Sequence, residues 1–270
     1  MTLVLAVVAG ALIGLSLGAL GGGGSILAVP VLVYALGQSP AQATTGSLVV
    51  VGVTSLIGAV TAYRSGHLLF ARGAVFGGVA LGGAAVGAKA AAHVSEPVLL
   101  ACFATLMLAV AAVMSLRLRR PDTGHPSPGA PDEPVITFTP TFACQCPRAL
   151  KVLITATVVG LLTGFLGVGG GFLVVPALLL ALALPMEYAA GTSLVVITMT
   201  SAVALAVRAG TGVSPDWWLV LVLTAASATG GFAGSRLARD IDARRLQTAF
   251  TGLVLAVAVY IGVRAFPPLL

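Results

Sequence analysis

The sequence predicts an all-α polytopic membrane protein built from two inverted repeats. Three observations predict this class: a very apolar composition, ten apolar runs of helical length, and a second half of the chain that repeats the first. Of the 270 residues, 58% are hydrophobic and only 8% are charged, and the mean hydropathy is +1.08. Because soluble domains carry about 25% charged residues, this chain cannot cover a water-exposed surface of its size.

The apolar runs form two groups of five, with a polar segment between them. They cover residues 2–20, 26–36, 41–62, 73–92 and 97–116, then 150–166, 172–183, 189–207, 217–235 and 247–264. The polar segment has five prolines between Pro121 and Pro134, which is typical of a linker. We therefore expect an N-terminal transmembrane repeat over 1–118, a cytoplasmic Pro-rich linker over 119–149 and a C-terminal transmembrane repeat over 150–270.

The two halves have similar sequences, and matching positions differ by a nearly constant residue number. "GALGGGGSILAVP" from Gly18 aligns with "GFLGVGGGFLVVP" from Gly164, with eight identities in thirteen at an offset of 146. "ATTGSLVVV" from Ala43 then meets "AAGTSLVVI" from Ala189 without a gap. Further blocks follow in the same order, so the chain contains an internal duplication of the kind found in many secondary transporters.

The distribution of Lys and Arg over the loops predicts how the repeats cross the membrane. If each glycine block joins the two arms of a hairpin, 11 of these residues lie on one side and 3 on the other; if it lies within one broken crossing, the split is 9 to 5. The positive-inside rule favours the hairpin. Each repeat then makes an odd number of net crossings, with about three to four full helices. The repeats are therefore expected to be inverted, with both termini outside a bacterial inner membrane.

Two of the apolar runs are too short to cross a bilayer. Runs 26–36 and 172–183 reach roughly 16–18 Å, about half of the hydrocarbon core, and each follows directly after a glycine block. Non-helical backbone at membrane depth is tolerated only where protein buries it or it lines a wet cavity. Helix N-termini carry free N–H groups and partial positive charge, so a pair of them predicts an anion site. The alternative is that the glycines only allow close helix packing.

Polar residues that match across the repeat extend this predicted site. "TTGS" at 44–47 and "AGTS" at 190–193 offer hydroxyl donors to the same ligand, although these hydroxyls could instead bond to their own helix turns. Arg64 and Arg208 end the third segment of each half and either steer anions or anchor their helices at the headgroups. The candidate substrate-binding residues are Gly21, Gly23, Gly24, Ser25, Thr45, Ser47, Gly167, Gly169, Gly170, Gly171, Thr192 and Ser193.

Several other functions are disfavoured by what the sequence lacks. The basic residues form no stripe with interleaved aromatics, so the net charge of +6 does not predict a nucleic-acid partner. No catalytic motif, phosphate-binding loop or dinucleotide fingerprint is present, and we expect neither an enzyme nor a cofactor. Cys144 and Cys146 are interpreted as reduced thiols in the linker, with a metal site as the alternative.

The twin blocks, one in each half around a hydrophilic linker, resemble the TauE/SafE family of bacterial membrane permeases. That family is associated with export of sulfite and organosulfonates such as sulfoacetate, so the resemblance implies a secondary exporter of small sulfur-containing anions. It also implies roles for Pro30 and Pro176 beside the glycines. The same holds for the two T-S elements, which are Thr45 with Ser47 in the first half and Thr192 with Ser193 in the second. The halves differ where Ser25 meets Gly171 and where "TTGS" meets "AGTS". A passive anion channel and a membrane assembly subunit without transport are the alternatives, and a homodimer is left open.

Overall fold

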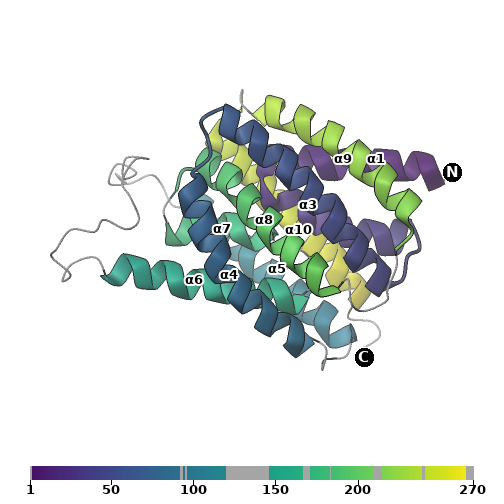
Figure 1. Ribbon diagram of the computed structural model, residues 1–270, viewed down its shortest axis with the longest axis horizontal. Helices are drawn as coiled ribbons and strands as arrows, with labels where there is room; N and C mark the ends of the chain where they lie inside the picture. The colour runs from purple at the N-terminus through teal and green to yellow at the C-terminus, as the bar shows by residue number, and fades with distance from the viewer. Residues whose placement is uncertain are drawn as a thin grey trace.

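In a computed structural model, the structure describes residues 2–91, 94, 96–119, 146–166, 171–182, 184–208, 215–238 and 241–265, and these residues form helices joined by short connections (Figure 1). The first half contains α1 (Thr2–Leu20), the short turns and helices η1 (Gly22–Gly24), α2 (Ser25–Pro30) and η2 (Val31–Ala35), and then α3 (Pro40–Arg64), α4 (Phe70–Ala91) and α5 (Glu96–Arg119). The second half contains α6 (Cys146–Leu166), α7 (Gly171–Ala181), α8 (Met186–Arg208), α9 (Trp217–Ala238) and α10 (Ala243–Ala265).

The predicted class of an all-α polytopic membrane protein is confirmed. Five described helices contain stretches long and apolar enough to cross a bilayer: Leu3–Leu20, Gln42–Arg64, Phe70–Gly87, Met186–Arg208 and Trp217–Ala238. Large apolar side chains also cover the outer surface, as Val4 at 69% and Leu221 at 61% exposure illustrate. Such an apolar exterior suits contact with lipid chains. The predicted linker lies mostly outside the described residues, so the division of the chain into domains stays a prediction.

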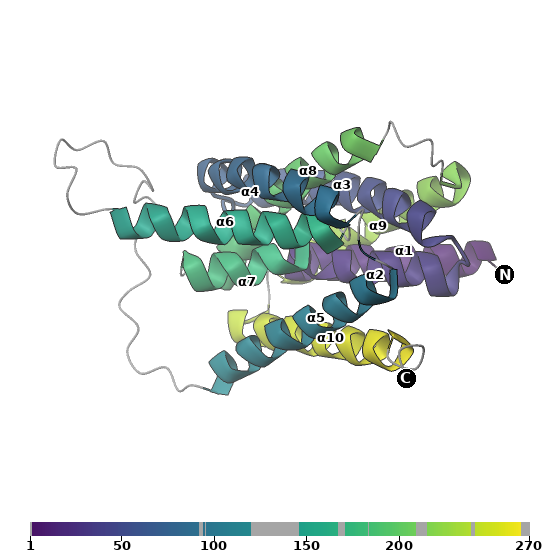
Figure 2. The ribbon, with the colours of Figure 1, turned by 90° about the horizontal axis from the view of Figure 1, so that it is seen from below.

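In each half, a short helical segment lies back against the long helix that precedes it in the chain. In the first half, Gly24 packs on Ile13 and Leu17 of α1, so the segment Gly22–Ala35 returns along the helix that precedes it. In the second half, α7 runs back beside α6 (Figure 2). The structure therefore has the hairpin arrangement and not a single broken crossing.

Helices of one half pack mainly on helices of the other. α1 packs on α9 and α6 packs on α4, while α3 packs on α8 and α5 packs on α10. In the duplication, α1 corresponds to α6, α3 to α8, α4 to α9 and α5 to α10. The contact of α1 with α9 is therefore equivalent to that of α6 with α4, and the α3–α8 and α5–α10 contacts each join two equivalent helices. The packing thus has the pairwise symmetry expected of two equivalent repeats.

The central helices α3 and α8, which correspond to each other in the duplication, run antiparallel. A Cβ atom added to Gly52 would lie 3.1 Å from Ser201 Cβ, one added to Gly58 would lie 3.0 Å from Leu194 Cδ1, and one added to Gly191 would lie 3.2 Å from Ala62 Cβ. As the residue number on α3 increases, the residue number of its contact on α8 therefore decreases. The inversion of the repeats would produce this antiparallel pairing of α3 with α8, and the inversion itself stays a prediction.

Small residues allow backbone contact between α1 and α9 and between α4 and α6. A Cβ atom added to Gly14 would lie 2.7 Å from Ser227 Cα of α9, and one added to Gly164 would lie 2.7 Å from Ala84 Cα of α4. The hydroxyl of Ser227 also donates a 2.9 Å hydrogen bond to the Gly10 carbonyl. For these glycines, outside the two turns, close helix packing explains their presence.

We expect Gly14→Leu to lower the melting temperature of the detergent-solubilised protein. The leucine would enter the backbone of Ser227, and overpacking of this kind costs about 1–3 kcal/mol. Gly78→Leu is the matched control, because Gly78 is exposed and has no atom within 4 Å of an added Cβ. Equal melting temperatures for the two variants would contradict the close contact of α1 with α9.

Candidate functional site

The first glycine turn meets the start of α7 in the interior of the protein. A Cβ atom added to Gly22 would enter the carbonyl group of Gly171 at the start of α7. One added to Gly171 would lie 2.8 Å from Ser25 Oγ and 2.7 Å from Ile197 Cδ1. Gly22, Ser25 and Gly171 are all buried. The beginnings of the two short helical segments are therefore in direct contact.

Gly21 has a backbone conformation that favours glycine. Its φ is 71° and its ψ is −116°. A Cβ atom at this position would lie 2.7 Å from Ala190 Cα and 2.9 Å from Ser193 Oγ. Both the positive φ and the close approach of α8 therefore exclude a side chain. The glycine turn of the first repeat consequently lies against the T-S element of the second.

The hydroxyl groups of the predicted site bond to nearby backbone. Ser47 Oγ donates to the Thr44 carbonyl at 2.8 Å, Ser193 Oγ donates to the Ala190 carbonyl at 2.7 Å, and Ser25 Oγ donates to the Gly22 carbonyl at 2.7 Å. Thr192 Oγ1 accepts a 3.2 Å hydrogen bond from the amide of Leu69. In this structure, each of these three serine hydroxyls therefore donates its hydrogen bond to a carbonyl of its own turn, which is the alternative to binding a ligand.

The remaining predicted glycines divide into packed positions and undescribed ones. Gly24 packs on α1, and a Cβ atom on Gly23 would lie 3.2 Å from the ring of Phe250 in α10. Thr45 is buried within α3. Gly167, Gly169 and Gly170 lie outside the described residues, as does Cys144. In the ranges that the structure does describe, His, Cys, Asp and Glu side chains form no group of three that could hold a metal ion.

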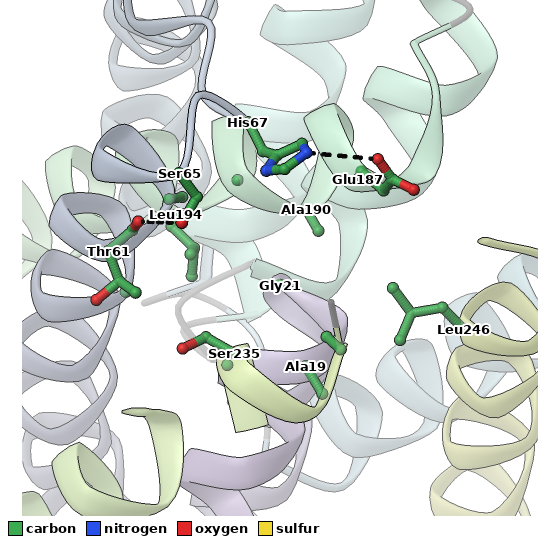
Figure 3. Close-up of a pocket in the computed structure, with 15 residues that line it drawn as sticks. Ala19, Gly21, Thr61, Ser65, His67, Glu187, Ala190, Leu194, Ser235 and Leu246 are labelled. Atoms are coloured by element: carbon green, nitrogen blue, oxygen red, sulfur yellow. Dashed lines mark hydrogen bonds and ion pairs between the residues drawn. The ribbon is translucent and has the colours of Figure 1, made fainter. Parts of the chain in front are cut away.

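A cavity of about 230 Å³ lies beside the first glycine turn (Figure 3). Gly21 is part of its wall, together with the end of α3, the start of α8 and the end of α9. At its rim, His67 Nε2 lies 3.7 Å from Glu187 Oε2, with the two side chains 42% and 53% exposed. Because both groups are so exposed, this pair contributes little to stability. We call this space the larger cavity.

A second cavity, of about 70 Å³, lies at the opposite end of the α3–α8 pair. The offset of 146 relates it to the larger cavity, because Leu48, Gly164, Ala204, Val207 and Arg208 in its wall correspond to Leu194, Gly18, Gly58, Thr61 and Ala62 in the wall of the other. We call it the smaller cavity. Each end of the molecule therefore has a version of the same cavity, and the two differ about threefold in volume.

The two arginines predicted to steer or anchor have different surroundings. Arg208 lines the smaller cavity and is partly buried, whereas Arg64 is exposed and lines neither cavity. Gly21 is a predicted site residue in the wall of the larger cavity, whereas His67, Glu187 and the other residues of that wall are not among the predicted site residues. No local pattern links His67 to Glu187, since 119 residues separate them and only the packing of α3 and α8 brings them together.

Comparisons with known proteins agree with the resemblance seen in the sequence. The family model described as "Sulfite exporter TauE/SafE" matches residues 6–261. Two curated relatives, each named "Probable membrane transporter protein", come from Xylella fastidiosa strains Temecula1 and 9a5c. Each is 31% identical over 263 residues, which is 96% of this chain and 95% of the relative. No solved structure matches the chain.

The match of the family model covers nearly the whole chain, including both glycine blocks and both T-S elements. The relatives add agreement along almost their full lengths, and their printed names describe membrane transport. A multi-pass membrane transporter is therefore what both the helices and the comparisons support. The chain belongs to the TauE/SafE family of sulfite exporters.

Proposed function

We propose that the protein is a secondary transporter that exports small sulfur-containing oxyanions, such as sulfite or organosulfonates. The observation that carries this proposal is the contact of the first glycine turn, at Gly22, with the start of α7, at Gly171, between two related cavities. The family's description as sulfite exporters supports the substrate class. The turn residues would then hold an anion that reaches them from one cavity at a time.

The chemistry of the turns suits an oxyanion. The first N–H groups of each short helical segment have no carbonyl one turn earlier within that segment, and the helix dipole adds partial positive charge there. These donors attract an anion without a fixed cation. Binding that is strong enough to admit an ion and weak enough to release it is what transport requires.

The unequal cavities support alternating access. If the repeats exchange conformations, the larger cavity closes and the smaller one opens, while the turns between them keep their contact. Inverted repeats commonly produce this exchange around a fixed midplane site. The structure would then represent the state that is open toward the larger cavity.

We further propose that the larger cavity opens to the cytoplasm of a bacterial inner membrane. Arg64, Arg72, Arg236, Arg244 and Arg245 flank the end of the molecule at which it lies, and such residues accumulate on the cytoplasmic side. The termini would then face outward and the 119–149 linker inward. For an exporter, the cytoplasmic cavity is the entrance.

Sidedness can be measured with single cysteines in a variant whose three native cysteines are replaced. We expect Thr61→Cys, in the larger cavity, to react with a membrane-impermeant thiol reagent in inside-out vesicles. Ala204→Cys, in the smaller cavity, should react slowly from that face, because the packed turns lie between it and the cytoplasm. Equal reaction of both cysteines from the cytoplasmic side would contradict the separation of the two cavities.

The function itself is tested by sulfite counterflow in proteoliposomes containing the purified chain. A secondary transporter should show saturable sulfite flux that unlabelled sulfite on the opposite side accelerates. A passive channel would conduct sulfite without such acceleration. An assembly subunit would carry no flux of sulfite, sulfoacetate or taurine, and that result would end the proposal.

A further inference from the structure

Two buried serines hold matching positions in the two repeats. Ser55 in α3 and Ser201 in α8 differ by the repeat offset of 146 and follow a threonine in both cases. Ser55 is fully buried and Ser201 is 1% exposed. Within the part of the chain that the structure describes, neither hydroxyl has a hydrogen-bond partner.

Other buried hydroxyls on the same two helices have partners. Thr54 Oγ1 donates to the Val50 carbonyl at 2.7 Å, and Thr200 Oγ1 donates to the Val196 carbonyl at 3.0 Å. Such bonding to the preceding turn is the ordinary solution for a hydroxyl in a membrane helix. Ser55 and Ser201 do not use it, although burying an unpaired hydroxyl costs free energy. Both repeats therefore keep the same unfavourable feature at the same place.

The other buried atoms without a partner do not share this relation. They belong to the amide group of Gln38, in the connection before α3. The corresponding position in the second repeat is Leu184, so the amide occurs in one half only. Among the described residues, the serine pair is thus the unpartnered polar feature that the duplication preserves.

The serines lie between the two cavities. Ser201 packs at the crossing of α3 and α8, where a Cβ atom added to Gly52 would lie 3.1 Å from Ser201 Cβ. Ser55 is three residues from Gly52, or about 4.5 Å along the helix. In the other direction, Gly58 lies three residues beyond Ser55 and lines the larger cavity, while Ala204 lies three residues beyond Ser201 and lines the smaller one.

We propose that Ser55 and Ser201 form a second binding point for the transported oxyanion, on its passage between the larger and the smaller cavity. The inference rests on the proposed function and adds two specificity-determining residues to it. Each O–H group donates to an anionic oxygen when the cavities exchange, which supplies the hydrogen bond that each hydroxyl lacks here. Because a hydroxyl carries no net charge, it holds the anion less strongly than a fixed positive charge would, and the anion can be released again.

The test is sulfite transport by the double variant Ser55→Ala and Ser201→Ala in proteoliposomes. Loss of two hydrogen bonds to a charged group should raise the KM for sulfite by about a hundredfold or more. The melting temperature should stay the same or rise, since each substitution removes an unpaired buried hydroxyl. Thr54→Val is the matched control, because it removes a buried hydroxyl that is satisfied within its own helix.

Each other outcome overturns the inference. If the wild type transports sulfite and the double variant keeps its KM, the serines do not contact the substrate while the proposed function stands. A lower melting temperature with an unchanged KM would assign the serines a structural role, for instance in holding a water molecule. If the wild type carries no oxyanion at all, the proposed function fails and this inference fails with it.

Discussion

Gly22→Ala should abolish most sulfite transport. The added methyl group would enter the backbone carbonyl of Gly171, and a carbonyl cannot rotate away as the end of a side chain can. The two turns must then separate, and relief of such overpacking costs about 1–3 kcal/mol. If a comparable amount of substrate binding is lost, transport at low sulfite concentration falls roughly tenfold or more, since each 1.4 kcal/mol is a factor of ten.

The matched control for this variant is Gly82→Ala. Gly82 lies in α4 with no atom within 4 Å of an added Cβ, and alanine stabilises a helix relative to glycine. Initial rates of sulfite flux and melting temperatures of both variants should be measured in parallel. Wild-type flux in Gly22→Ala, at normal protein levels, would show that contact between the turns is not needed for transport.

Thr61→Trp should block transport while leaving the fold intact. Thr61 lines the larger cavity of about 230 Å³, and an indole ring there would fill a large part of the space through which the anion reaches Gly21. The substitution removes the exposed 2.9 Å hydrogen bond from Thr61 Oγ1 to the Ile57 carbonyl but keeps the Thr61 carbonyl that accepts from Ser65, so the protein should remain folded. Sulfite flux should fall to the level of empty liposomes, with a melting temperature close to that of the wild type.

The neighbouring residue provides a sharp control for that substitution. Val60 is 48% exposed on the outer surface of the same helix, and Val60→Trp places the same ring against lipid. We expect Val60→Trp to transport sulfite at the wild-type rate. Loss of flux in both variants would point to a general disturbance of α3, and loss in neither would exclude the larger cavity as the route.

Much of the architecture could be predicted from the sequence, because the signals are local or duplicated. The short lengths of runs 26–36 and 172–183 predict half-helices, and the structure has short segments at Gly22–Ala35 and Gly171–Ala181. The glycine blocks predict turns inside the protein, and Gly21 and Gly22 lie in one. The duplication predicts matching halves, which the pairwise helix contacts reproduce.

The cavities could not be predicted, because their walls come from helices far apart in the sequence. Gly21, Thr61, Glu187 and Ser235 line one cavity only because α1 packs on α9 and α3 packs on α8. The sequence also contains no signal that separates Ser47, which bonds to its own helix, from Ser55, which does not. That difference depends on rotamers and neighbours and not on residue type.

The role of glycine shows how packing decides between two interpretations of the same residue. Gly14 and Gly164 allow helices to touch along their lengths, as glycines commonly do in membranes. Gly21, in contrast, combines a φ of 71° with contact to the second repeat at the wall of a cavity. Close packing is therefore confirmed for Gly14 and Gly164, whereas the anion-binding role of the turn glycines stays a prediction.

The most direct test of the proposed site is an experimental structure of the protein with bound selenite, used as a sulfite analogue with a heavier central atom. The anomalous signal of selenium locates the anion without reference to the surrounding protein. We expect one selenium peak beside the turn of residues 21–25 and the start of α7 at Gly171. A peak remote from both turns, with none between the repeats, would contradict the account.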